Sequence, residues 1–249
     1  MDLDYLKYLA AKNKFPLAVM EKDFMLTKTL KVVSESELRE KLVFKGGTAL
    51  NKLYFGYYRL SEDLDFTAIH TDISEILNFI EKITGELKTN VKDENETKFS
   101  YTGKLSFIGP LNHQNSFKVD ISWREKPLLP LVIKKVKSTY PEIPEFKIQT
   151  FQLKELVAEK FRALTQRGKP RDYFDVWFVC KKRPEILKDI RPLVISKCEN
   201  IGIEFKPKKI FENLDDVEKL WKQDLIELLP EVVDFKVVIS ELKEQIKYL

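Results

Sequence analysis

Cysteine, histidine and glycine are scarce in this chain of 249 residues, which has two cysteines, two histidines and eight glycines. Cys180 and Cys198 are too few for a disulfide framework, so we expect a reducing compartment. Because His70 and His113 belong to no Cys/His spacing pattern, the sequence argues against a zinc site. No apolar run approaches the ~20 residues that span a bilayer, and residues 1–15 are not typical of a signal peptide. We therefore expect a cytoplasmic protein with no membrane partner.

Charged residues are abundant, at 33% of the chain, and the net charge is +4. A mildly basic chain tolerates a nucleic-acid or nucleotide partner without demonstrating one. The basic clusters at 134–137, 181–183 and 206–209 are scattered, and we expect them at helix ends or in loops.

The hydrophobic pattern changes character at about residue 150. Before that point, helical periodicity alternates with short apolar or alternating runs that are rich in β-branched and aromatic residues. The expected strands are 41–44, 63–69, 98–109, 116–123 and 146–150, and the expected helices are 2–13, 17–34, 48–58 and 73–87. From Leu153 onward the pattern is helical, interrupted only by prolines. The sequence therefore predicts an α+β fold with an α/β domain at 1–150 and a helical domain at 151–249.

Two of the scarce glycines, Gly46 and Gly47, are adjacent and stand between a predicted strand and a predicted helix. Such a turn lets backbone N–H groups approach a phosphate closely, and the helix N-terminus adds a favourable dipole. Thr48 is available as a helix cap or a hydroxyl donor, and Ser61 offers a second hydroxyl. No Gly-Lys-Thr follows the pair, so this is not a P-loop. We expect these four residues to bind nucleotide phosphates.

Three aspartates supply the chemistry. Asp63 and Asp65 lie two residues apart on a predicted strand, so their carboxylates point to one face with Cα atoms roughly 6.5 Å apart. Asp120 stands between the apolar Val119 and Ile121 on another strand, and it joins them if the two strands are neighbours. Clustered carboxylates raise one another's pKa, which a divalent cation relieves. Mg²⁺, with Mn²⁺ as the alternative, suits carboxylates and phosphate oxygens, and two such ions support phosphoryl-type transfer.

A basic residue on the first helix of the second half is a candidate phosphate ligand. Lys160 and Arg167 are seven residues apart and share a helix face, before Gly168 and Pro170 end that helix. A compact ammonium neutralises charge that develops on a phosphate, which makes Lys160 the best candidate for binding a triphosphate. The alternative is a solvent-facing lysine.

The next helix begins with Arg171 and Asp172, and Asp175 follows one turn later. A structural network is the alternative for this segment, with Asp172 as a helix cap and Arg167 or Arg171 paired to Asp175. For Arg167 and Asp172 we favour that alternative. Asp175 precedes an apolar run, so we expect it to be buried and to orient a basic residue.

Each feature alone has an ordinary explanation, because a glycine pair is usually a turn and a single aspartate is usually a surface residue. Their order favours a metal–nucleotide site. That order resembles the polymerase β-type nucleotidyltransferase superfamily, and within it the AbiEii/AbiGii toxins of type IV toxin–antitoxin and abortive-infection systems. The resemblance rests on "MEKDFML" (20–26), "FKGGTAL" (44–50), "YRLSEDLDF" (58–66), "VDI" (119–121) and "EKFRALTQRGKPRDYFDVWFV" (159–179).

The resemblance implies a mixed β-sheet flanked by helices and followed by a C-terminal helical bundle that completes the site. It implies transfer of a nucleoside monophosphate from an NTP to an RNA 3′ end, tRNA being the expected class. Asp63, Asp65 and Asp120 would be catalytic metal ligands. Lys160, Arg171 and Asp175 would join the nucleotide site, and an antitoxin protein would be the partner.

Two other functions stay open. A non-catalytic nucleotide- or RNA-binding module could use the same scaffold, although the three aspartates argue against it. Nucleotidylation of a protein or a small molecule is the other alternative, and the sequence separates it only weakly from an RNA acceptor.

Overall fold

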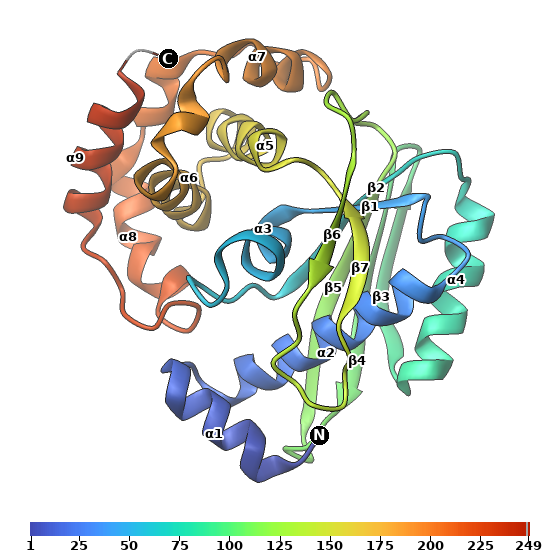
Figure 1. The fold of residues 1–249 in the computed structure, drawn as a ribbon. Coiled ribbons are helices and arrows are strands. Elements are labelled where there is room, and N and C mark those ends of the chain that lie inside the picture. Colours follow the sequence, from blue (N-terminus) through green and yellow to red (C-terminus); the bar gives the residue numbers. More distant parts are fainter. Residues whose placement is uncertain (248) are drawn as a thin grey trace. The chain divides into compact units, whose positions relative to one another are not determined.

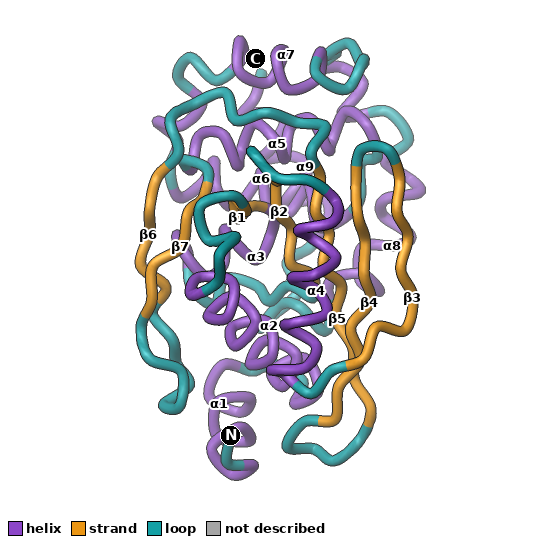
Figure 2. The backbone as a smooth tube through the Cα atoms, turned by 90° about the vertical axis from the view of Figure 1, so that its right-hand side faces the viewer, coloured by secondary structure: helices purple, strands orange, loops and turns teal. Residues whose placement is uncertain are grey.

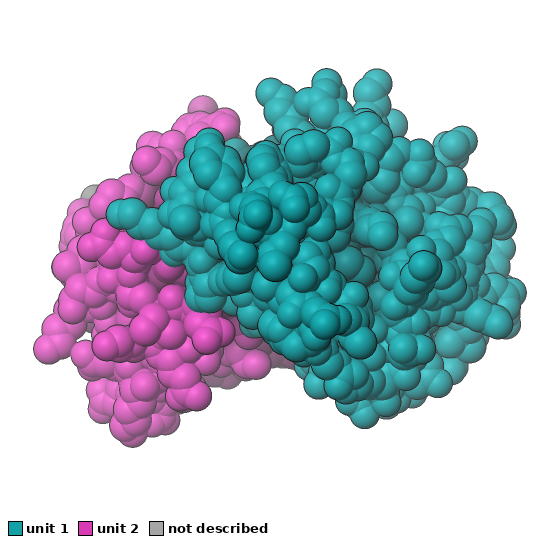
Figure 3. Space-filling model, turned by 90° about the horizontal axis from the view of Figure 1, so that it is seen from below, with its two compact units in different colours: residues 1–151 teal, residues 152–249 magenta. Residues whose placement is uncertain are grey.

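The computed structural model describes residues 1–247 and 249, which form two compact units. The first is Met1–Phe151 and the second is Gln152–Leu249, drawn in teal and magenta in Figure 3. This division is based on contacts within the chain. That the two units are independent domains, as the sequence predicts, stays a prediction.

A mixed sheet of seven strands forms the first unit, in the order β3-β4-β5-β2-β1-β7-β6 (Figure 1 and Figure 2). β2 is parallel to β5 and β1 is parallel to β7, whereas the other neighbours are antiparallel. The strands are β1 (Leu42–Lys45), β2 (Asp63–Ala68), β3 (Asn90–Thr97), β4 (Ser100–Ile108), β5 (Gln114–Ser122), β6 (Val132–Val136) and β7 (Phe146–Thr150). The predicted mixed sheet is confirmed.

Two helices, α2 (Leu17–Glu35) and α4 (Ile73–Leu87), cover the apolar face of this sheet and lie in front of it in Figure 2. Asn115, on the same face of β5 as Phe117 and Val119, donates to the carbonyl of Ala18 in α2. Along α4, five apolar side chains at helical spacing are buried, namely Ile76, Phe79, Ile80, Ile83 and Leu87. α1 (Leu3–Asn13) precedes α2. Most side chains on the opposite face of the sheet are polar, and the buried Val43 is an exception.

The helix predicted at 48–58 is wrong in its bounds and its form. α3 (Gly46–Leu50) starts at the first glycine and passes into a π-helical turn at Asn51–Phe55. Lys45 is the N-cap and provides no side-chain bond, so the prediction that Thr48 caps the helix is also wrong. π-helical turns are rare and often occur at functional sites.

Two strands were not predicted. β3 is exposed along all eight of its residues, so it lacks the alternation of apolar and polar residues that marks a half-buried strand. β6 includes Lys134 and Lys135 of the 134–137 cluster, which we expected at a helix end or in a loop. Both strands are at edges of the sheet, where lysines and other polar residues are common because they oppose pairing with another chain.

The second unit is helical, as predicted. Its α-helices are α5 (Leu153–Gln166), α6 (Pro170–Lys182), α7 (Arg191–Glu199), α8 (Leu214–Leu225) and α9 (Phe235–Ile246). Proline stands in the first turn of α6 and α7, where a missing N–H costs nothing. No helix among the described residues is long and apolar enough to cross a membrane.

A buried ion cluster joins α5 to α7. The Lys197 ammonium lies 2.6 Å from a carboxylate oxygen of Glu155 and 2.8 Å from one of Glu159. The side chains of Lys197 and Glu155 are fully buried. Removing one partner of such a cluster leaves an uncompensated charge away from water, which is costly.

Replacing Lys197 by Met should therefore lower the free energy of unfolding by about 3–5 kcal/mol. Urea denaturation followed by circular dichroism measures this value. The matched control is Lys219→Met, which removes a lysine from an exposed pair with Asp216 and should leave the transition unchanged. Equal effects of the two variants would contradict the proposed importance of the buried cluster.

Candidate functional site

Asp65 of β2 and Asp120 of β5 are direct neighbours in the sheet. The strands are parallel, and the register pairs Asp65 with Asp120. Asp63 lies two residues before Asp65, so it shares their face, while Leu64 and Phe66 are buried on the other. The condition on which the sequence prediction depended, that these two strands are adjacent, is confirmed.

Gly46 touches the Asp65 carboxylate. A Cβ atom built on Gly46 would lie 2.0 Å from Oδ2 of Asp65, and the residue has a φ of +79°. Both the close approach and the left-handed backbone require glycine. The first glycine of the pair therefore fixes the start of α3 against the carboxylate face of the sheet.

Gly47 is approached by a buried arginine that the sequence analysis did not assign. A Cβ atom on Gly47 would lie 2.4 Å from a terminal nitrogen of Arg59 and 3.3 Å from the Ser61 hydroxyl. Arg59 is only 2% exposed, and it donates to the Leu60 carbonyl at 2.8 Å. Its position in "YRLSEDLDF", just ahead of Ser61 and the aspartates, was the one signal that could have identified it. Arg59 and Ser61 lie together against the glycine pair.

Thr48 links α3 to the acidic strand. Its hydroxyl donates to the backbone carbonyl of Asp63, and the residue is 1% exposed. The bond holds the start of β2 against the first turn of the helix. A direct contact between Thr48 and a phosphate stays a prediction.

Asp65 and Asp120, together with Asp63 on the same face, are called the carboxylate row below. Polar residues on the neighbouring strands pair with this row on both sides. Thr102 of β4 is the register partner of Asp120, and its hydroxyl donates to Oδ1 of Asp120 at 2.5 Å. On the other side, Lys45 is the register partner of Asp65. The Lys45 ammonium lies 3.1 Å from Glu125, in the segment after β5. These contacts orient Asp120 and hold that segment close to the end of β1.

The donor chemistry of Asp63, Asp65 and Asp120 fits a magnesium ion, because carboxylate oxygens on one face are the ligands that it prefers. Within residues 1–247 and 249, no group of three or more His, Cys, Asp or Glu side chains is drawn together as a metal site. Asp65 instead lies against Gly46, and Asp120 accepts the bond from Thr102. That these aspartates bind metal stays a prediction.

In the second unit, Lys160 is held by two buried carboxylates. Its ammonium lies 2.7 Å from Asp175 and 3.2 Å from Asp172, and both acids are at most 1% exposed. The expectation that Asp175 is buried and orients a basic residue is confirmed. The alternative of a solvent-facing Lys160 is wrong, because only 12% of its side chain is exposed.

Asp172 also accepts two bonds from Arg167, at 2.9 and 3.2 Å. A structural network for Arg167 and Asp172 is confirmed, with Arg167 paired to Asp172 itself. The expectation that Asp172 caps the helix is wrong, because Lys169 is the N-cap of α6 and no side chain caps it. Burial favours the neutral acid, but the Lys160 ammonium and the Arg167 guanidinium outweigh it and hold the Asp172 pKa below its usual range. Asp172 therefore stays ionised and fixes Lys160 across the break between α5 and α6. Arg171 is half-buried in the first turn of α6, and its predicted role in nucleotide binding stays a prediction.

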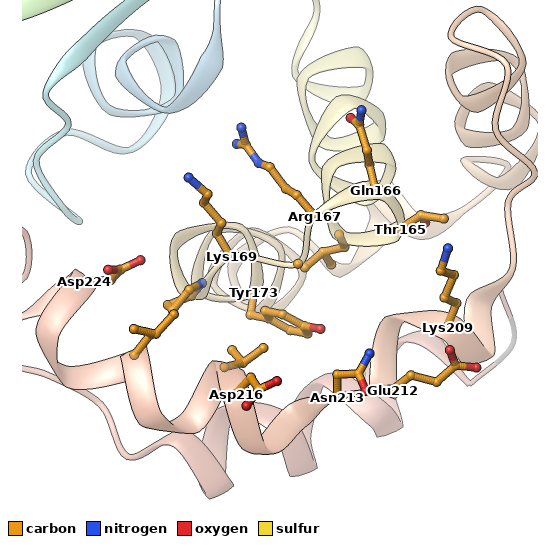
Figure 4. A pocket seen from close by; sticks show the side chains of 15 residues that line it. Thr165, Gln166, Arg167, Lys169, Tyr173, Lys209, Glu212, Asn213, Asp216 and Asp224 are labelled. Atoms are coloured by element: carbon orange, nitrogen blue, oxygen red, sulfur yellow. The ribbon is translucent and has the colours of Figure 1, made fainter.

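A cavity of about 510 Å³ opens within the second unit beside this break. Figure 4 shows Arg167 and Lys169 extending from the α5–α6 connection, with Asn213 and Asp216 of the segment around α8 across the cavity. Arg167 and Lys169 lie on one wall, and the other carries both acids and Lys209, which lies beside Glu212 (Figure 4). Such a lining favours a group of mixed polarity over a bare polyphosphate.

Comparison with known proteins gives one family. The model of "Nucleotidyl transferase AbiEii toxin, Type IV TA system" matches residues 28–241. A curated relative, "Uncharacterized protein aq_aa25" of Aquifex aeolicus (strain VF5), is 31% identical over 77 residues. That match covers 28% of this chain and 37% of the relative, so the chain spans well under half of the length of that protein.

Solved structures share the fold. MenT4, a nucleotidyltransferase toxin from Mycobacterium tuberculosis H37Rv, has a TM-score of 0.73 at 17% identity, over 98% of this chain and 88% of that one. JHP933 from Helicobacter pylori has a TM-score of 0.60 at 21% identity, over 92% and 90% of the two chains. Identities this low establish the fold alone.

Replacing Gly46 by Ala should lower the free energy of unfolding by about 1–2 kcal/mol, because alanine is strained at positive φ and its methyl displaces the Asp65 carboxylate. The matched control is Gly85→Ala in α4, where nothing lies within 4 Å of the new methyl. The control should raise stability by about 0.5–1 kcal/mol. Thermal unfolding measures both, and a Gly46→Ala protein as stable as the wild type would contradict the close approach.

Replacing Asp172 by Asn should cost about 1–3 kcal/mol of stability at pH 7, because it removes charge-assisted bonds to Lys160 and Arg167. The folded pKa of Asp172 lies below the unfolded value of about 3.9, so its contribution is complete above that pH and is lost as pH falls through the folded pKa.

Urea denaturation of the wild type and Asp172→Asn between pH 7 and pH 3 tests this linkage. The difference between their free energies of unfolding should become smaller below about pH 4. A gap that does not change with pH would contradict it. The exposed Asp216→Asn variant is the control and should show no gap at either pH.

Proposed function

Since this chain belongs to the AbiEii family of nucleotidyl transferase toxins of type IV toxin–antitoxin systems, we propose that it transfers a nucleoside monophosphate from an NTP to the 3′ hydroxyl of an RNA. Membership of this family supports a toxin nucleotidyltransferase. The nucleotide, the metal and the acceptor are the parts that we propose.

One observation carries the proposal: the register of Asp65 with Asp120, beside the glycine at which α3 begins. Three carboxylates share a face of the sheet, and a helix N-terminus starts against the same face. A metal–nucleotide site needs acids that bind cations, and it needs backbone N–H groups that can approach phosphates.

In this proposal Asp63 and Asp65 hold the cations, and Asp120 completes the set. Bound Mg²⁺ would neutralise the phosphate charge and polarise the attacking oxygen and the leaving oxygen at the α-phosphorus. Gly46 and Gly47 let the backbone approach the phosphates, and the hydroxyls of Thr48 and Ser61 lie in the same cluster. Arg59 acts as a positioning residue, because it is buried against Gly47.

The reaction is a displacement at the α-phosphorus. The acceptor oxygen forms a bond to the α-phosphorus, the bond from that atom to the bridging oxygen breaks, and pyrophosphate leaves with the electron pair. Asp120 would accept the acceptor's proton, since it lies next to Asp65 and its carboxylate is oriented by Thr102.

Lys160 of the second unit is proposed to bind the triphosphate. Its ammonium is already fixed by Asp172 and Asp175, so little side-chain entropy is lost when it meets a phosphate. Arg171 and Asp175 are proposed to belong to the same nucleotide site. Their support is the pattern "RDYFD" together with the buried Lys160–Asp175 pair.

We propose tRNA as the acceptor class on the basis of the family resemblance, and an antitoxin protein as the partner that restrains the activity. The support for the antitoxin is that the matching family is named for a type IV toxin–antitoxin system. A basic net charge of +4 is compatible with an RNA substrate.

Label transfer tests the proposal. The wild-type protein is incubated with Mg²⁺, total RNA, cell protein and each of the four NTPs labelled at the α-phosphate. Label should enter an RNA band, and Asp65→Asn should abolish transfer by at least about 10³-fold while the protein stays folded. The matched control is Asp4→Asn, which removes an exposed carboxylate from a surface pair with Lys7 and should transfer at the wild-type rate.

Label in protein would contradict an RNA acceptor and support nucleotidylation of protein. Label in RNA that persists in Asp65→Asn would contradict the assignment of the carboxylates. Repeating the assay after chelation with EDTA tests the metal, because activity that survives EDTA contradicts a Mg²⁺-dependent mechanism.

A further inference from the structure

Aromatic and cationic side chains gather where the turn between β3 and β4 meets the end of β5. We call this group the aromatic–cation patch and define it as Lys98, Phe99, Trp123 and Arg124. Phe99 is 46% exposed although it is a large apolar residue. The turn that carries it joins β3 to β4 in Figure 2. An exposed aromatic ring among cations has the chemistry on which single-stranded nucleic acids stack and pair their phosphates.

Backbone and side-chain contacts fix the patch in place. The Trp123 backbone N–H donates to the Phe99 carbonyl at 3.1 Å, and the Trp123 indole N–H donates to the Lys98 carbonyl at 2.7 Å. The Lys98 ammonium lies 5.5 Å from the centre of the Phe99 ring, and the Arg124 guanidinium carbon lies 5.8 Å from it. Two cations therefore lie within 6 Å of the centre of one exposed ring, on a turn that is hydrogen-bonded to Trp123.

The patch is close to the carboxylate row within the same unit. Trp123 comes three residues after Asp120, just past the end of β5 at Ser122, a span of about 10 Å. The ion pair between Lys45 and Glu125 holds the next residues beside the end of β1, at the register position of Asp65. A chain that reaches the carboxylates would therefore find aromatic rings and cations within a few nucleotides of its end.

We propose that the aromatic–cation patch binds unpaired bases of the acceptor RNA near the 3′ end that receives the nucleotide. An unpaired base stacks on Phe99, and the ring of Trp123 extends the platform. Lys98 and Arg124 neutralise the neighbouring phosphates, and Arg124 also stacks as a plane. This assignment rests on the proposed function, because it names residues that hold the proposed acceptor.

The chain contains a matched control for this arrangement. Tyr8 of α1 is 53% exposed, and the Lys12 ammonium lies 5.5 Å from its ring centre. This pair has the same chemistry on a single helix, and α1 lies at the other end of the strands from the β3–β4 turn (Figure 2). The Tyr5 ring lies 5.9 Å from the Tyr8 ring, so this group also has two rings and a cation, and it differs from the patch by its place at the other end of the strands.

Binding of a short fluorescein-labelled single-stranded RNA, followed by fluorescence anisotropy in EDTA, tests the patch without catalysis. Phe99→Ala should weaken binding about tenfold, and Phe99→Tyr should restore it because a ring is present again. Arg124→Ala should weaken binding and lower its dependence on salt concentration by about one phosphate contact. Tyr8→Ala and Lys12→Ala should bind as the wild type does, and circular dichroism checks that each variant is folded.

Equal binding by the wild type, Phe99→Ala and Arg124→Ala would overturn the inference, as would equal losses in the Tyr8 and Lys12 variants. An unchanged RNA affinity together with loss of a protein partner would assign the patch to that partner instead. The label-transfer assay distinguishes failure of the proposed patch from failure of the proposed RNA acceptor. Transfer to RNA by a Phe99→Ala protein of unchanged affinity overturns the patch alone, whereas a wild-type protein that neither binds nor labels RNA overturns the proposed acceptor as well.

Discussion

The candidate site depends on one close approach, that of the Gly46 backbone to the Asp65 carboxylate. No other residue type fits there, because a Cβ atom would lie 2.0 Å from Oδ2 and the backbone has positive φ. The approach sets where α3 begins, and the Thr48 hydroxyl then fixes the helix to the carbonyl of Asp63. A helix N-terminus, two backbone N–H groups and two acids are brought together by a turn of a few residues. The parallel pairing of β2 with β5 adds Asp120.

In the second unit, buried charged side chains hold the candidate phosphate ligand, Lys160, in place. Asp172 and Asp175 fix the position of the Lys160 ammonium, which we propose meets the phosphates of the nucleotide. Arg167 balances the second acid, so the cluster contains two cations and two anions. A neutral cluster of this kind avoids the cost of an unpaired buried charge. Lys197 lies between Glu155 and Glu159, and Arg162 pairs with Glu159 at 3.2 Å, so the cluster between α5 and α7 also has two cations and two anions.

Local pattern was sufficient to predict the strand that carries Asp63 and Asp65, because polar and apolar residues alternate along it. It could not place Asp120, because strand order depends on the whole sheet and only the pairing of β2 with β5 brings the acids together. Arg59 was missed because a buried arginine looks like any surface arginine until its partners are known. The contact of Lys160 with Asp172 spans twelve residues and a helix break, so helical periodicity does not reveal it. β3 was missed because every residue in it is exposed.

We propose that Asp63, Asp65 and Asp120 bind divalent cations together with a nucleotide. Electron paramagnetic resonance of Mn²⁺, titrated into the protein with a non-hydrolysable NTP analogue, tests it most directly and needs no acceptor. We expect about two bound ions for the wild type and a loss of binding in Asp65→Asn. Equal Mn²⁺ binding by a folded Asp65→Asn protein would contradict the claim.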